Sequence, residues 1–101
     1  MSASAKNNYA IVLNLTGASG AFTVNGNTTA SINDGDAAII DNYATGDSPF
    51  KNVPLSGPAG SGTAATVTVG GGENSWSIFV FTTNGYCNVF SSSNADYVDL
   101  S

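Results

Sequence analysis

Residues 76 to 90 constrain the fold of this chain most, because they place two apolar runs on either side of an Asn-Gly pair. Such a pair between strand-forming runs is the strongest short-range signal for a β-hairpin, since both residues tolerate the positive φ angles of a type I′ turn. With Asn84 and Gly85 as a two-residue loop, Phe81 pairs with Asn88 across the hairpin. Both faces of the strands are then largely apolar, which is typical of strands covered on both sides. The sequence therefore predicts a central hairpin that is buried on both faces.

Alternating polar and apolar residues elsewhere in the chain predict further strands. These lie at residues 9–15, 21–24, 27–32, 37–42, 64–69 and 95–100. A second Asn-Gly pair, Asn25-Gly26, predicts a hairpin in which Thr23 pairs with Thr28. No stretch of the sequence shows a helical period. The fold class expected is all-β, an antiparallel β-sandwich or small Greek-key barrel of seven to nine short strands.

The length of 101 residues fits one domain, residues 1–101, with a single hydrophobic core. Residues 1–7 are small and polar and are expected to form a flexible lead-in. Residues 43–62 contain all three prolines with many Gly, Ser and Asn residues, and they are expected to form a long loop. A short edge strand at residues 50–55 is compatible with this composition, because proline is tolerated at sheet edges.

The charge of the chain excludes several classes of partner. Only 9% of the residues are charged, the formal net charge is −5, and Lys6 and Lys51 are the only basic residues. Nucleic-acid binding and docking on anionic lipid both need clusters of cations, so neither is expected. Ser, Thr, Asn and Gly must supply the solubility instead. An uncharged polar surface of this kind is typical of sugar-binding modules and of subunits partly covered by their own copies.

Cellular location is constrained by two further features. The N-terminal residues contain no hydrophobic segment, so we expect no signal peptide in this chain. Cys87 is the only cysteine, which leaves the chain without an internal disulfide and favours a cytoplasmic protein or one exported by a non-conventional route. On the predicted hairpin Cys87 is expected to be a small buried hydrophobic residue.

Enzymatic chemistry has few candidate residues here. The chain has no histidine, which removes Ser-His and Cys-His nucleophile pairs and nearly every zinc site. Paired carboxylates remain, but most of the acidic residues stand in or beside turns, where Asp caps the backbone. We therefore expect no enzyme and no cofactor. Asp34 and Asp36 are weak candidates for calcium ligands, and a structural turn explains them as well.

Binding is the remaining class of function, and aromatic rings beside neutral acceptors suggest carbohydrate. A ring face stacks on the apolar side of a pyranose, while Asn, Asp and backbone groups meet its hydroxyls. Two rings fall in the expected loop among polar residues, and a third follows the tip of the central hairpin. The predicted ligand-binding residues are Tyr43, Asp41, Asn42, Asp47, Phe50, Asn52 and Tyr86.

The first hypothesis is a small non-catalytic lectin that binds glycans in a defence or recognition role. In size and composition the whole chain resembles the small cytoplasmic lectins and defence proteins of fungal fruiting bodies, although no motif is specific to them. A toxin-like or cytolysin-like sandwich that binds membrane lipid is the alternative, supported by the surplus of aromatic residues. A self-assembling structural subunit is a further alternative, and a homo-oligomer is expected under each. A protease inhibitor that presents the proline-containing loop is a fourth, weaker option.

Overall fold

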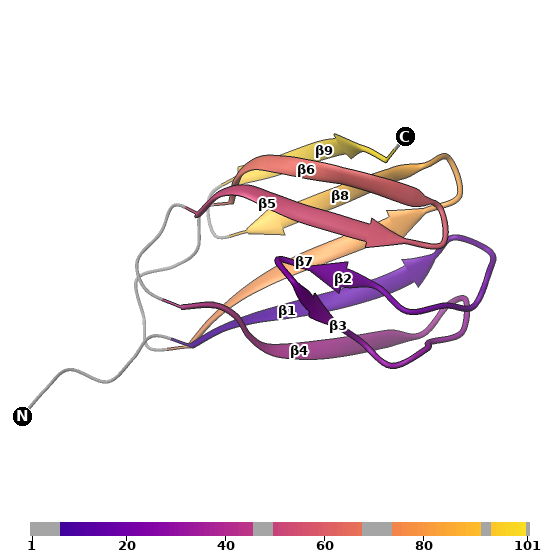
Figure 1. Cartoon of the computed structure of the whole chain (residues 1–101), viewed down its shortest axis with the longest axis horizontal. Coiled ribbons are helices and arrows are strands. Elements are labelled where there is room, and N and C mark those ends of the chain that lie inside the picture. The colour runs from indigo at the N-terminus through magenta and orange to yellow at the C-terminus, as the bar shows by residue number, and fades with distance from the viewer. Residues whose placement is uncertain (1–6, 46–49, 68–73, 92–93, 101) are drawn as a thin grey trace, which may run out of the picture.

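The computed structural model describes residues 7–45, 50–67, 74–91 and 94–100, and these form strands and turns without a helix. The strands are β1 (Asn7–Leu15), β2 (Thr23–Val24), β3 (Asn27–Thr28), β4 (Ala37–Thr45), β5 (Phe50–Gly57), β6 (Gly60–Val67), β7 (Asn74–Thr82), β8 (Tyr86–Ser91) and β9 (Asn94–Asp99). They build two sheets that lie one in front of the other (Figure 1). The predicted all-β sandwich is confirmed. Within the described ranges no helix could cross a membrane.

One sheet has five strands in the order β4-β1-β7-β8-β9, and the other has four in the order β3-β2-β5-β6. All neighbouring strands are antiparallel except β1 and β7, which run parallel from Asn7–Asn74 to Leu15–Thr82. This long parallel pair places the first strand of the chain beside the predicted central hairpin (Figure 1). Nothing in the local sequence pattern predicted a parallel pair.

The central hairpin forms, but its register differs from the expected one by one residue. Phe81 pairs with Cys87, and Val80 pairs with Asn88. The loop therefore has three residues, and Gly85 with a φ of 76° is the only one of them with a positive φ. A three-residue loop with Gly in the left-handed region is the next commonest hairpin connection after the two-residue turns. The prediction of a type I′ turn at this hairpin is wrong.

The shifted register separates the two faces of the hairpin. One face enters the core with Phe79, Phe81, Cys87 and Val89, which are all buried. The opposite face lies outside the sandwich, because successive side chains of a strand point to opposite sides of the sheet. The prediction that this hairpin is buried on both faces is therefore wrong.

The second hairpin has the predicted register. Thr23 pairs with Thr28, and the two hydroxyl oxygens lie 2.9 Å apart. The loop residues Asn25 and Gly26 have φ angles of 52° and 83°, as a type I′ turn requires.

The expected long loop at residues 43–62 is mostly strand. β4 continues to Thr45, and β5 and β6 form a tight hairpin whose ladder runs from Phe50–Val67 to Gly57–Gly60. Pro54 is accommodated because β2 ends at Val24, so no carbonyl of β2 needs a donor at that position. The Pro54 carbonyl still accepts a bond from the N–H of Asn25, at 2.8 Å. Residues 1–6 of the expected lead-in lie outside the described residues, and Asn7 already belongs to β1.

The core fills the space between the sheets with aromatic and branched side chains. Phe22 packs on Phe81 with ring centroids 4.6 Å apart at 52°, joining the two sheets. At one edge β6 of the smaller sheet approaches β9 of the larger sheet very closely. A Cβ atom added to Gly62 would lie 2.4 Å from the carbonyl oxygen of Asp99. Glycine at this position allows the edge of the sandwich to close.

Cys87 is buried as expected, and its protonation predicts a loss of stability in alkali. Burial raises the pKa of the thiol from its ordinary value of 9.0 to about 12. Above pH 9.0 the unfolded chain therefore releases a proton that the folded chain retains. The contribution of the neutral thiol to the free energy of unfolding is fully present below pH 9.0. Above it, the free energy of unfolding should fall by about 1.4 kcal/mol per pH unit as the pH rises toward the pKa of the folded state. Urea unfolding on both sides of pH 9.0 measures this slope.

The variant C87A is the control for this slope. It should be less stable below pH 9.0 because it removes a buried side chain, but the part of the alkaline slope due to the thiol should disappear. An unchanged slope in C87A would contradict the assignment to Cys87.

Candidate functional site

The outer face of the five-stranded sheet carries most of the exposed apolar surface. In β1, Ala10 and Val12 enter the core, so Ile11 and Leu13 between them point outward. The register continues this arrangement into the neighbouring strands, where Ile39 and Ile78 stand beside Ile11. An outer sheet face normally carries polar residues, so this one departs from the usual pattern.

We call part of this face the outer apolar patch. Its exposed members are Leu15 at 42% exposure, Ile39 at 60%, Trp76 at 48%, Ile78 at 38% and Phe90 at 45%, with Tyr9, Ile11, Leu13 and Val80 partly exposed among them. Trp76 stacks on Tyr9 with ring centroids 4.7 Å apart at 27°. Among the described residues, the exposed large apolar side chains all lie on this outer face.

A more polar group, the tyrosine platform, occupies the corner of the same face on β7, β8 and β9. It consists of Thr82, Tyr86, Asn88, Tyr97 and Asp99. Tyr97 is 66% exposed, and its ring stacks on that of Tyr86 with centroids 4.8 Å apart at 28°. Asp99 is exposed and stands opposite Tyr86 in the ladder. The corner thus combines a ring held by stacking with an exposed carboxylate.

Asn88 sits in the middle of this corner, between Val80 on one side and Tyr97 on the other. Its Oδ1 atom is buried and has no hydrogen-bond partner among the described residues. A buried unpaired carbonyl costs about 1–3 kcal/mol, which makes it an unusual feature in a sheet. The side chain is consequently kept there at a cost to stability.

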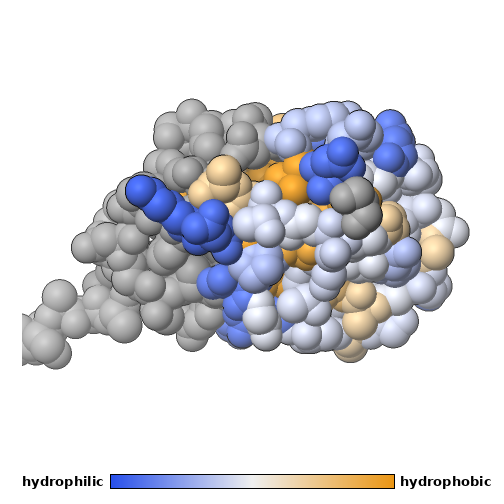
Figure 2. All heavy atoms as spheres, turned by 45° about the horizontal axis from the view of Figure 1, so that its top comes forward, coloured by the Kyte–Doolittle hydropathy of each residue, from blue (hydrophilic) through white to orange (hydrophobic). Residues whose placement is uncertain are grey.

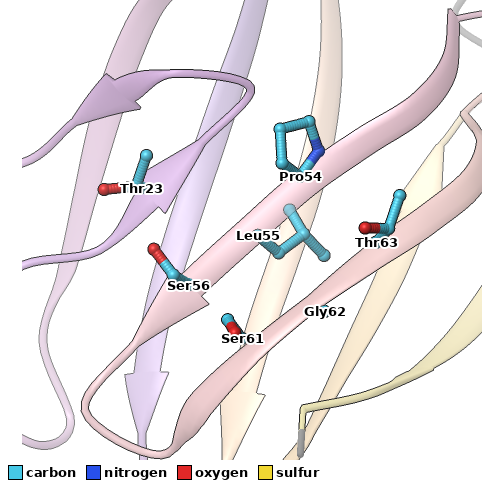
Figure 3. Close-up of a pocket in the computed structure, with 7 residues that line it drawn as sticks. All are labelled: Thr23, Pro54, Leu55, Ser56, Ser61, Gly62 and Thr63. Carbon is cyan, nitrogen blue, oxygen red and sulfur yellow. The ribbon is translucent and has the colours of Figure 1, made fainter.

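The opposite sheet presents a different kind of surface. A shallow hollow of about 290 Å³ lies over β2, β5 and β6 (Figure 3). Its lining consists of Thr23, Pro54, Leu55, Ser56, Ser61, Gly62 and Thr63. Hydroxyl groups are plentiful in this hollow, but it offers neither an aromatic ring nor a charge. On the side of the molecule seen in Figure 2 most residues have intermediate hydropathy, in keeping with this Ser- and Thr-rich lining.

The predicted ligand-binding residues come from both sheets. Asp41, Asn42 and Tyr43 belong to β4 of the larger sheet, whereas Phe50 and Asn52 belong to β5 of the smaller one. Asp41 and Asn52 are exposed, and Asn52 has a φ of 54°. Asp47 lies outside the described residues, as do the side chains of Asn42, Tyr43 and Phe50.

Tyr86 is at the other end of the five-stranded sheet. Tyr43 lies near the start of β1, beside the Ala44–Asn8 pair, whereas Tyr86 follows the hairpin that closes next to Leu15. Eight residues of strand separate the two ends of β1, which corresponds to roughly 25 Å. The structure therefore divides the predicted set, and only Tyr86 joins the tyrosine platform.

The calcium candidates lie just before β4, and the Asp34 side chain has a structural role there. Asp34 accepts a hydrogen bond from the N–H of Gly17 at 2.9 Å through Oδ1, and the Asp36 carbonyl accepts one from the N–H of Asn14, also at 2.9 Å. In the part of the chain that the structure describes, no three carboxylate or thiol side chains gather as a metal site would need.

Tyr97, Asn88 and Asp99 were absent from the predicted site. Alternation in the last strand already placed Tyr97 and Asp99 on one side, but only the pairing of β8 with β9 reveals that Asn88 and Tyr86 share that side. A one-residue error in loop length moved Asn88 to the wrong face.

Comparison of the chain with protein-family models, with curated proteins and with solved structures gave no match in any of the three.

Proposed function

We propose that the protein is a non-catalytic carbohydrate-binding module that holds a sugar on the tyrosine platform. The observation that supports this most is the exposed ring of Tyr97, stacked on Tyr86 and flanked by Asp99. A ring fixed by a neighbouring ring loses little conformational freedom when a ligand covers it. Preorganisation of this kind favours a flat, neutral ligand.

The chemistry around the ring suits hydroxyl groups. The Asp99 carboxylate and the Thr82 hydroxyl oxygen accept hydrogen bonds, and the Asn88 amide nitrogen beside them is a donor. Thr82 already donates to the Tyr86 carbonyl at 3.1 Å, which leaves its oxygen lone pairs to accept. With no arginine in the chain, an anionic ligand has no strong partner here. A neutral sugar is the polyhydroxylated ligand that this set of groups fits.

The protease-inhibitor hypothesis loses its support, because it relied on a long loop where the structure has strands. Catalysis lacks support as well, since the platform holds a single carboxylate and glycosidases use two.

Replacing Tyr97 with Ala tests the sugar proposal. Y97A should lower the apparent affinity for the best-bound glycan on an array of neutral oligosaccharides by at least about tenfold, equivalent to 1.4 kcal/mol. The reason is that the variant removes the stacking surface but leaves the buried core untouched.

Y97F is the matched variant, and it should keep most of the signal because the ring remains. Circular dichroism would show that both variants are folded. Absence of binding by the wild-type protein to every neutral glycan in multivalent form would refute the proposal, and so would equal binding by Y97A.

A further inference from the structure

The outer apolar patch is in the size range of the largest apolar patch on a typical monomer, which is often functional. Leu15, Ile39, Trp76, Ile78 and Phe90 are each roughly 40–60% exposed. Together they leave on the order of 500 Å² of apolar side chain in water, since a large side chain presents about 150–250 Å² in full. The largest apolar patch on a typical monomer covers about 300–600 Å² and is itself often functional.

The shape and size of the patch fit another sheet. A standard stable interface buries about 800 Å² on each partner. The exposed members of the patch and the partly exposed side chains between them approach this area. Sheets pack face to face about 10 Å apart with their strands within about 30° of each other. Two copies of one twisted sheet satisfy this geometry without a change of fold.

The charges favour a second copy over a lipid surface. Within the described residues the only cation is Lys51, which lies on β5 of the opposite sheet. Surfaces that lie on membranes usually combine apolar residues with Lys or Arg near the headgroups. No member of the patch is charged, and the exposed Asp41, two residues after Ile39 on β4, would have to lie at the rim, where its carboxylate keeps its water.

We infer that the outer apolar patch is the interface of a homodimer, formed by the same patch of a second copy about a two-fold axis. A two-fold arrangement is the commonest one for soluble oligomers, and it uses identical surfaces. If the second copy is centred over β1 and β7, the tyrosine platform lies at the rim of the interface. The dimer would therefore present two tyrosine platforms, one from each subunit. The inference concerns different residues from the sugar proposal and does not rest on it.

The experiment compares the wild-type chain with I39K and T63K by sedimentation velocity over about a hundredfold range of concentration. Ile39 and Thr63 are both exposed strand residues, on β4 and β6, so each variant adds the same charge to a different sheet. The wild type and T63K should form dimers, whereas I39K should raise the dimer dissociation constant at least about tenfold. Because both subunits are acidic, added salt should strengthen the dimer.

Two readouts keep the test independent of any folding defect in I39K. The wild type alone should show a blue shift of Trp76 fluorescence as its concentration rises, since the half-exposed indole becomes buried in the dimer. A wild type that stays monomeric at every concentration would overturn the inference, and so would a dimer unaffected by I39K. If the wild type is monomeric and floats with neutral phosphatidylcholine vesicles, the patch binds a lipid surface instead of a second copy. Sugar binding by Tyr97 in a monomer would leave the proposed function standing while the dimer fails.

Discussion

The variant N14D is expected to lose about 4 kcal/mol of unfolding free energy at neutral pH. For a domain of this size that is a large part of the total stability. The substitution changes only one amide to a carboxylate. Its effect is large because Asn14 is fully buried and uses both ends of its side chain.

The contacts of Asn14 join three segments of the chain. Its Nδ2 donates to the carbonyls of Ala18 at 2.8 Å and Ile32 at 3.1 Å. Its Oδ1 accepts from the Thr16 N–H at 3.0 Å and from the Thr16 hydroxyl at 2.7 Å. A carboxylate has no donor, so the carbonyls of Ala18 and Ile32 would each lose one of their two hydrogen bonds and face a negative charge. The turn after β1 and the segment leading to β4 should loosen together.

The deficit of N14D should shrink in acid. Burial and the two carbonyls disfavour the charged form, so the pKa of the new carboxyl in the folded state should exceed its unfolded value of about 3.9. A group with a raised folded pKa is least destabilising below the unfolded value, and the loss grows as pH rises toward the folded one. Urea unfolding of N14D and wild type over this pH range measures the difference.

Two control variants separate charge from packing. N14L also removes the hydrogen bonds from Asn14 to the Ala18 and Ile32 carbonyls, so it should be destabilised without the pH dependence. N84D makes the same chemical change at the exposed tip of the central hairpin and should alter stability by less than about 0.5 kcal/mol. A loss in N14D as small as in N84D would contradict the role of Asn14.

The fold class was predictable because it follows from local sequence patterns. Alternation marks most strands, and Asn25-Gly26 adopts the predicted turn because both residues accept positive φ. Asn84-Gly85 carries the same dipeptide but adopts a different turn. The dipeptide restricts the loop without fixing its length, and the packing of Phe81 and Cys87 in the core decides between two and three residues.

Two other features depend on contacts that local sequence does not encode. The parallel pairing of β1 with β7 joins segments nearly seventy residues apart, from Asn7 with Asn74 onward. Prolines and glycines suggested a loop between β4 and β6 that could hold a short edge strand at residues 50–55. The strand there is β5, which lies inside its sheet between β2 and β6 and not at an edge. β5 nevertheless forms there, because its neighbour β2 is only two residues long and has no carbonyl that needs a backbone N–H from Pro54.

Of the candidate site, the sequence predicted Tyr86, after the Asn-Gly tip, and placed the acidic and amide neighbours around Tyr43 and Phe50. In the structure Tyr86 stands beside Tyr97 and Asp99, which were not predicted. The other expected residues are spread over both sheets. Which face of a strand reaches solvent depends on which face the second sheet covers. This depends on how the two sheets pack, so the sequence alone did not predict that Tyr97 and Ile39 are exposed.

The variant G62A is expected to lose about 3 kcal/mol of unfolding free energy, although it adds only a methyl group. The new Cβ would lie 2.4 Å from the Asp99 carbonyl oxygen and 3.2 Å from side-chain carbons of Val98 and Leu100. A backbone oxygen cannot move aside as a flexible side chain can, so β9 as a whole must retreat from β6. Val98 and Leu100, both buried, would lose packing.

S61A is the matched control, because Ser61 is exposed on the same strand and its change should cost less than about 0.5 kcal/mol. Urea unfolding compares the two variants, and a G62A as stable as S61A would show that the sheets do not close at this edge. The displacement has a further consequence, because β9 also carries Tyr97 and Asp99. G62A should therefore weaken the proposed glycan binding from the opposite sheet, without touching the tyrosine platform, while the proposed dimer through Ile39 and Ile78 persists. Loss of both functions together would indicate general unfolding instead of a shift of β9.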